Sequence, residues 1–419
     1  MNGPRVLVAL LVLLAGCGGA AAPEATVNET VSPTTSTEPA TALNDTETPS
    51  AVAPGDIEMF VTNGELPFAP EPVFTDVLNL TGTVVDAPIV EIETQDDTGP
   101  DILDTRQSPF RRSLGITTPE NGSVTATAYT PADGTSVHIY ERLLSAPVVT
   151  ETTLAHEFVH VVQFASGWGG VMWENRSQVA YDPSYDGTTT YYLILEGAAV
   201  YAEDHYRQRH TNVSESPMVA YRDAYRNASA LDRLSIARYY YGSQYVAERA
   251  GSPSNLSGVH LNAPASSEQV LHDSRDPIAP LEVSVEEAEG WNLENRDRMG
   301  ELFLRVALRT ELNRSTAVDA AAGWGDDRKL SYTNGEDSGY AWVLRWDNST
   351  EATEFEDAFR TYLGEKASEQ DGVWVGDGAN SSYRVERTTE TTVVVFLGND
   401  SFVRNATATE EAGEIVVEP

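Results

Sequence analysis

Apolar residues recur at helical spacing through the middle of the chain, from Thr153 to about Tyr206. The same period returns in Ser216–Asn227, where Pro217 suits the first position of a helix, and in Ala230–Ala250. A repeat near 3.6 residues gathers apolar side chains on one face, which a helix needs in order to pack on a neighbour. The pattern therefore predicts a helical centre.

Short segments with strand character flank this centre. Before it, Gly82–Val85, Ser123–Tyr129 and Val137–Tyr140 alternate with turn-rich loops. After it, the expected elements are a helix around Arg296–Leu312, strands near Leu330–Tyr332 and Ala341–Trp346, a helix over Glu351–Leu363, and a closing hairpin of Tyr383–Arg387 and Thr391–Phe396. Strands on both sides of a helical centre predict an α+β fold.

The first 17 residues have the pattern of a lipoprotein signal peptide. Met1–Arg5 carries one positive charge, and Val6–Leu14 is an apolar run too short to span a bilayer. The run ends in Leu14–Cys17, which resembles a lipobox whose cysteine receives a diacylglyceryl group. Cys17 is the only cysteine, so no disulfide or cysteine metal site is possible. We expect signal-peptide removal and lipidation at Cys17, which anchors the protein on the extracellular face of the cell membrane.

Residues 18–55 are dominated by Ala, Thr, Pro, Glu and Ser. Such a segment cannot bury enough apolar surface to fold, so we expect a disordered stalk between the anchor and the folded part. Asn-x-Ser/Thr sequons recur in the stalk and beyond, and an exported protein can carry glycans on such sites. They include Asn28, Asn44, Asn79, Asn121, Asn212, Asn255, Asn348, Asn380, Asn399 and Asn405.

The chain is strongly acidic. It has 64 acidic and 27 basic residues, a formal net charge of −37, and only two lysines, Lys329 and Lys366. Self-repulsion on this scale disfavours a compact state in dilute buffer, whereas at molar salt the screening length falls to about 3 Å. A salt-adapted surface of a halophile explains the charge, with a dedicated partner for an acidic patch as the alternative. The charge argues against nucleic acid as a partner.

One helical segment carries an HExxH motif, with Thr153 available as its N-cap and Gly167 as its C-terminal stop. His156 and His160 are one turn apart, so their imidazoles can reach one ion at about 2.0–2.1 Å. Glu157 lies about 100° around the helix, where its carboxylate can take a proton from metal-bound water without binding the metal. The alternative is a helix with two solvated or core histidines.

A second helical segment, Tyr191–Asp204, reads E-G-x-A-x-Y from Glu196. An HExxH helix followed some tens of residues later by such a segment resembles the gluzincin type of zinc metallopeptidase. The resemblance implies that His156, His160 and Glu196 bind Zn2+ and that Glu157 is the general base. The alternative for Glu196 is an acid on a helix surface.

The resemblance also implies roles for residues that follow Glu196. Gly197 and Ala198 would let the two helices approach closely around the ion. Glu203, two turns after Glu196, could accept a hydrogen bond from a ligating imidazole.

Two related patterns are excluded by their own residues. The metzincin extension needs Gly and His where Gln163 and Ser166 stand, and the thermolysin-like pattern usually has Asp where Val200 stands. The resemblance is therefore to the gluzincin clan at large. It covers about 50 residues around the two motifs, and it does not define a substrate.

Further segments are similar to uncharacterised HExxH proteins of bacteria and archaea. They are the Tyr- and Gly-bearing Tyr239–Val246, the P-x-S-S-E-Q-V-L-H pattern within Ala263–His272, the segment Gly323–Arg328, and Trp346 with Asp347. Together with the leader and the acidic charge, they resemble a surface lipoprotein of a haloarchaeon.

A peptidase also needs a donor that stabilises the developing oxyanion. Tyr240, Tyr241 and His272 are the candidates, with aromatic packing between helices as the alternative for the tyrosines and helix capping for the histidine. The remaining histidines, which have no motif context, are His138, His205, His210 and His260.

These patterns lead to a prediction for the whole chain. The fold is α+β, with a zincin-like catalytic core over residues 56–280 that combines a mixed sheet, the HExxH helix and the helix that carries Glu196. Residues 281–419 form a C-terminal α/β region that ends in a β-hairpin and either stands alone or belongs to the same domain. We expect a cell-surface, metallopeptidase-like protein that hydrolyses peptide bonds of a peptide or protein substrate. A zinc-bound water is the expected nucleophile and Glu157 the expected general base. The alternative is a non-catalytic surface binding or envelope-maintenance lipoprotein. A purely structural zinc is weaker, because three ligands leave an open position.

Overall fold

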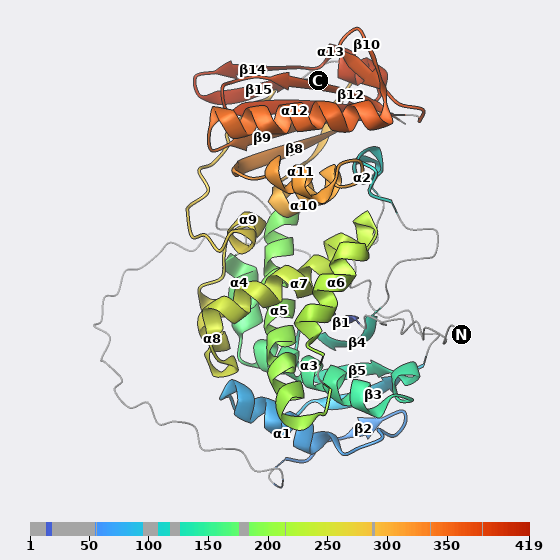
Figure 1. Cartoon of the computed structure of the whole chain (residues 1–419), viewed down its shortest axis with the longest axis vertical. Coiled ribbons are helices and arrows are strands. Elements are labelled where there is room, and N and C mark those ends of the chain that lie inside the picture. Colours follow the sequence, from blue (N-terminus) through green and yellow to red (C-terminus); the bar gives the residue numbers. More distant parts are fainter. Residues whose placement is uncertain are drawn as a thin grey trace, which may run out of the picture.

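The computed structural model describes residues 14–18, 55, 57–94, 108–117, 126–175, 184–213, 215–286, 290–335, 337–378 and 380–419. The signal peptide and the stalk therefore lie almost entirely outside the described residues, and nothing of the Cys17 side chain is described. Within the described ranges, no helix combines the length and the apolar character needed to cross a membrane. The described part is α+β, as expected (Figure 1).

A five-stranded mixed sheet forms the N-terminal part of the molecule. Its order is β1 (Leu14–Gly18), β4 (Ala126–Pro131), β5 (Ser136–Tyr140), β3 (Ile89–Glu93) and β2 (Val61–Thr62). β4 runs antiparallel to β5, whereas β1 is parallel to β4 and the pairs β5–β3 and β3–β2 are parallel. The strand predicted at residues 137–140 is confirmed, and the described part of the strand predicted from residue 123 falls in β4.

The predicted strand Gly82–Val85 is wrong. Helix α1 (Pro70–Thr81) precedes it, and Gly82 ends that helix with a φ of 68°. Proline in the first turn and a left-handed glycine after the last turn are ordinary helix boundaries. The buried Phe74 of α1 packs edge-on against Phe158, with ring centroids 5.0 Å apart, so tertiary packing also favours the helix.

The predicted helical centre is confirmed. It consists of α3 (Pro147–Ala165), α5 (Tyr185–His210), α6 (Pro217–Asn227) and α7 (Ala230–Ala250), and the shorter helices α4 (Trp168–Asn175), α8 (Leu256–Leu261) and α9 (Ser267–Leu271) pack with it. Helix α3 starts six residues before the expected cap Thr153, because Pro147 supplies the first turn. Gly167 does follow its end, with a φ of 74°.

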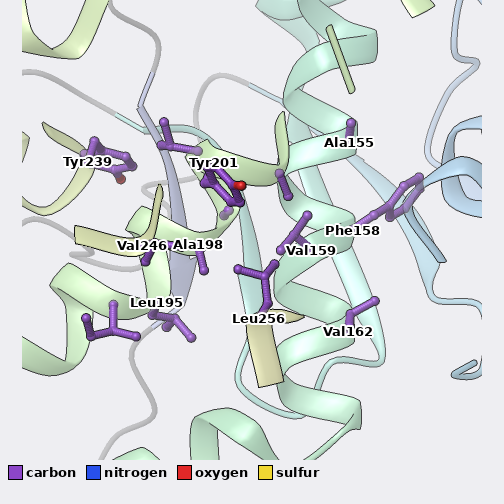
Figure 2. Packing of buried hydrophobic residues seen from close by; sticks show 14 of the residues in the cluster. Ala155, Phe158, Val159, Val162, Leu195, Ala198, Tyr201, Tyr239, Val246 and Leu256 are labelled. Carbon is purple, nitrogen blue, oxygen red and sulfur yellow. The ribbon is translucent and has the colours of Figure 1, made fainter. Parts of the chain in front are cut away.

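The core of this part lies where α3, α5 and α7 meet (Figure 2). Ala155, Phe158 and Val162 of α3 are fully buried, as is Ala198 of α5. Gly197 does not face the HExxH helix as expected. It faces α7, where an added Cβ would lie 2.2 Å from the carbonyl carbon of Gly242. Two glycines therefore set the close approach of α5 and α7, and any larger side chain there forces the helices apart.

A seven-stranded antiparallel sheet dominates the C-terminal part, at the top of Figure 1. In sheet order its strands are β10 (Ser368–Gln370), β11 (Val373–Val375), β12 (Ser382–Arg387), β13 (Thr392–Gly398), β9 (Asp337–Trp346), β8 (Trp324–Asn334) and β7 (Asn292–Asp297). Helices cover one face of the sheet, namely α2 (Pro109–Ser113), α10 (Gly300–Leu308), α11 (Arg314–Asp319) and α12 (Ser349–Lys366).

The other face of the sheet packs on the last segments of the chain and on β6 (Val283–Val285), which precedes the sheet in sequence. The last segments are α13 (Asp400–Asn405), β14 (Thr407–Glu411) and β15 (Glu414–Glu418), and β14, β15 and β6 form a small sheet. The expected hairpin is present as β12 and β13, but it does not close the chain. The helix predicted from Arg296 begins only at Gly300, because residues 292–297 join the sheet as β7.

Candidate metal centre

The HExxH helix brings two imidazoles together. His156 and His160 project from successive turns of α3, both fully buried, and their Nε2 atoms are 3.2 Å apart. The third group comes from α5, where Glu196 Oε2 lies 3.4 Å from His156 Nε2 and 3.3 Å from His160 Nε2. The three residues form a group that could hold a metal ion, as the motif predicts.

Hydrogen bonds on the far side of each ring fix which nitrogen carries the proton. His156 Nδ1 lies 3.2 Å from Glu203 Oε2, and His160 Nδ1 lies 2.7 Å from Gln163 Oε1. Because both oxygens are acceptors, both Nδ1 atoms donate, and in the neutral rings both Nε2 atoms present lone pairs. Two such lone pairs and a carboxylate oxygen at this spacing repel one another unless a cation lies among them.

The pKa values of His156 and Glu196 also indicate that this site favours positive charge. Burial opposes protonation of His156, but the hydrogen bonds to Glu196 and Glu203 raise its pKa to about 10. Burial alone would raise the pKa of Glu196, but His160 and His156 lower it to about 2. The cluster therefore favours a proton or a metal ion where the Nε2 atoms face each other.

Glu157 lies beside this group without belonging to it. Its Oε2 accepts a hydrogen bond of 2.6 Å from Thr130 of β4, and its Oε1 is buried with no hydrogen-bond partner among the described residues. Burial raises the pKa of Glu157 to about 7, against the opposing effect of His160 and His156. A carboxylate with a pKa near neutrality suits general-base chemistry.

The structure does not bring the predicted oxyanion donors to this site. Tyr240 and Tyr241 pack on Tyr225, with ring centroids 5.4 and 5.2 Å from it. The Nε2 atom of His272 lies 3.0 Å from both Glu301 Oε2 and Arg305 Nη2. These contacts occupy all three side chains elsewhere in the molecule.

The position of α9, which precedes His272, explains its distance from the site. The backbone N–H of Ser267 in α9 donates to Asp186 in the first turn of α5. Glu196 lies ten residues further along that helix, which corresponds to roughly 15 Å at 1.5 Å per residue.

Two other tyrosines lie at the metal centre. The ring of Tyr239 lies 6.3 Å from that of His156, and Tyr221 of α6 stacks on Tyr239 at 4.7 Å. Burial raises the pKa of Tyr221 well above its usual range, and the carboxylates of Glu203 and Glu196 raise it further. The hydroxyl of Tyr221 therefore lies within electrostatic reach of the Glu196 carboxylate and remains protonated. Tyr239 stands next to a predicted candidate in the sequence, whereas no local motif marks Tyr221.

Sequence reasoning also missed Gln163 and His260. Gln163 Nε2 lies 2.9 Å from the carbonyl oxygen of Leu195 and 3.1 Å from His260 Nε2. The spacing of Gln163, one turn after His160, was a usable signal, whereas His260 reaches the site from α8 without any motif.

The other histidines lie away from the centre. His138 belongs to a second group of possible metal ligands with Glu91 and Glu93, half-buried on β3 and β5. Both ring nitrogens of His138 already have hydrogen-bond partners, Glu93 at 2.7 Å and Ser136 at 3.0 Å. His205 Nδ1 donates to a backbone carbonyl of its own helix.

Comparison with known proteins adds one match. The profile of a domain of unknown function (DUF8575) matches residues 286–407. This range covers all seven strands of the C-terminal sheet and includes none of the residues of the possible metal site. No curated protein and no solved structure matches the chain.

Proposed function

We propose that this chain is a zinc-dependent, gluzincin-like metallopeptidase of the cell surface. The observation that carries the proposal is the convergence of His156 Nε2, His160 Nε2 and Glu196 Oε2 at 3.2, 3.3 and 3.4 Å, with both Nδ1 atoms bonded to acceptors. Two imidazoles and a carboxylate are a zinc donor set, and three protein ligands leave a position for substrate or water.

The residues around this set have distinct roles in the proposed reaction. Zinc bound there would act as a Lewis acid and lower the pKa of water. Glu157 takes a proton through Oε1, while Thr130 holds Oε2. The hydroxyl of Tyr221, which its raised pKa keeps protonated, donates a hydrogen bond to the substrate oxygen as negative charge develops.

A peptide in extended form suits the position next to Glu157. Thr130, which contacts Glu157, lies on β4, and the outer edge of β4 pairs with the extended segment β1. Residues 14–16 of β1 belong to the predicted signal peptide, so the proposed removal of that peptide would free this edge for an extended substrate. Backbone pairing of this kind is a common mode of peptide recognition. A mixed sheet with one antiparallel strand pair, β4 and β5, beside the HExxH helix supports the zincin-like interpretation of the core. The N-terminal sequence supports export and lipidation at Cys17.

The alternative function is a surface binding protein that keeps the metal centre but hydrolyses nothing. Complete burial of His156, Glu157, His160 and Glu196 favours this alternative, because a substrate must displace some part of the chain to reach them. The intact Glu157 favours the enzyme.

One experiment separates the two functions. Zinc content and cleavage of a peptide library are measured in high salt for the wild type and for Glu157→Gln, which keeps the shape of the side chain. Zinc in both proteins with cleavage by the wild type alone supports the peptidase, and we expect the variant to be at least about 100-fold slower. Zinc in both without cleavage by either supports the binding protein. A wild type that binds no zinc contradicts both.

A further inference from the structure

The side-chain amide of Gln163 makes three hydrogen bonds to groups behind the possible metal site. Its Oε1 accepts from His160 Nδ1 at 2.7 Å, and its Nε2 donates to the Leu195 carbonyl at 2.9 Å and to His260 Nε2 at 3.1 Å. Gln163 and His260 are almost completely buried, so no solvent competes for these bonds.

The tautomer of His260 is fixed independently of the amide. His260 Nδ1 lies 2.7 Å from the carbonyl oxygen of Leu256, an acceptor, so Nδ1 carries the proton. Burial lowers the pKa of His260 to about 4, which keeps the ring neutral at ordinary pH. The Nε2 atom of His260 is therefore an acceptor, and only the N–H end of the Gln163 amide can face it.

The orientation of this amide matters for His160. An amide has a donor end and an acceptor end of nearly the same shape. Rotation by 180° would point the N–H groups at His160 Nδ1, which would then have to accept. The ring proton of His160 would move to Nε2, the atom that faces Glu196, and that nitrogen could not bind a metal.

We infer that Gln163 and His260 are positioning residues of the metal centre. His260 and the Leu195 carbonyl hold the Gln163 amide in one orientation, and that orientation keeps the Nε2 lone pair of His160 directed at the metal. The inference rests on the proposal that His160 binds zinc. It goes beyond that proposal because it assigns a role to a histidine outside both motifs, 100 residues after the ligand it serves.

The test measures zinc affinity of the full chain by competition with a fluorescent chelator. In His260→Phe, the aromatic ring is retained but the acceptor is lost, and we expect affinity to fall about tenfold, as when outer partners of metal ligands are removed. His205→Phe is the matched control, because His205 makes the same bond to a carbonyl four residues earlier but does not contact Gln163. Its affinity should equal that of the wild type.

Gln163→Glu makes the test specific to amide orientation. A carboxylate accepts at both ends, so it can still receive the His160 Nδ1 proton, and affinity should stay within about threefold of the wild type. In that background His260→Phe should cause no further loss. The absorption spectrum of the Co2+-loaded protein should change with His260→Phe only when residue 163 is glutamine. Unfolding midpoints of the metal-free variants show whether each protein is folded.

The outcomes separate the inference from the function on which it rests. Wild-type zinc affinity in His260→Phe overturns the inference, and so does an equal loss in both backgrounds, which would mean that His260 contributes packing alone. Neither result affects the assignment of the ligands. A wild type that does not bind zinc overturns the proposed function itself, and this inference with it.

Discussion

Asp327 in the C-terminal sheet and Glu196 in α5 are both carboxylates buried from solvent, but their surroundings differ. Asp327 Oδ1 accepts from the Met299 backbone at 2.8 Å and the Trp342 indole at 3.1 Å, and Oδ2 accepts from the Gly300 backbone at 2.8 Å and the Trp324 indole at 3.1 Å. Burial raises the pKa of Asp327 to about 6, so at neutral pH a carboxylate meets four donors.

Glu196 faces two histidines instead. Its Oε2 lies 3.4 Å from His156 Nε2 and 3.3 Å from His160 Nε2, and although burial opposes it, the two histidines lower the pKa of Glu196 to about 2. The three residues form a group that could hold a metal ion, and the opposite nitrogen of each ring is bonded to an acceptor. The first cluster binds backbone and indole N–H groups of the C-terminal part, whereas the second is a possible cation site.

Asp327→Ala should have the largest effect on stability. The substitution leaves four buried N–H groups without acceptors, and we expect the free energy of unfolding to fall by about 3–5 kcal/mol. Chemical denaturation with and without zinc checks this, and the loss should be the same in both. Glu157→Gln is the contrasting variant, because Glu157 already has an oxygen without a partner, and its metal-free stability should change by less than about 1 kcal/mol. Equal losses in the two variants would mean that the four hydrogen bonds to Asp327 contribute no more to stability than the single bond to Glu157.

Zinc should stabilise the protein only through the second cluster. At 1,000 times the dissociation constant, binding to the folded state alone adds about 4 kcal/mol to the free energy of unfolding. The increase should appear in the wild type and in Asp327→Ala and be absent in His160→Ala. Thermal unfolding with zinc and then with a chelator checks this. A zinc-dependent increase in His160→Ala would place the binding site elsewhere.

Tyr221→Phe should lower kcat/KM for a cleaved peptide by about 100-fold, the usual cost of an oxyanion donor. Zinc content should not change, because the hydroxyl is not a ligand in the proposed site. Tyr240→Phe is the matched control on the neighbouring helix and should lower activity less than about twofold, since Tyr240 packs on Tyr225 away from the metal centre. A larger effect in Tyr240→Phe than in Tyr221→Phe would restore the sequence-based candidate.

Glu203→Gln should have the smallest effect of this series. The amide keeps an acceptor for His156 Nδ1 but loses the negative charge, which also pairs with Arg207 at 3.0 Å. We expect zinc affinity to fall about tenfold. Chelator competition measures it, and unchanged affinity would mean that Glu203 acts only in the ion pair with Arg207.

The sequence predicted the arrangement of the possible metal ligands where local spacing determines geometry. His156, Glu157 and His160 share one helix, so the HExxH pattern alone predicts their arrangement. The structure brings Glu196 and Glu203 to that group as the resemblance implies. Tyr221 and His260 come from helices that local pattern does not place relative to α3, so their contacts depend on tertiary packing.

The errors have physical reasons of the same kind. Thr153 is an acceptable N-cap by itself, but Pro147 starts the helix earlier and buries Thr153 in it. Gly197 was expected to face α3, but the small residue that fits it, Gly242, lies on α7. Arg296 and Asp297 were assigned to the following helix, because their pairing partners in β8 are more than thirty residues away in sequence.

The most direct test of the central claim is the zinc content of the purified full chain, measured by elemental analysis after dialysis, beside His156→Ala, Glu196→Ala and His138→Ala. The three-ligand site predicts one zinc per chain in the wild type and in His138→Ala, which alters the other possible ligand group, and loss of zinc in His156→Ala and Glu196→Ala. No zinc in the wild type, or zinc lost in His138→Ala but kept in His156→Ala, would contradict it.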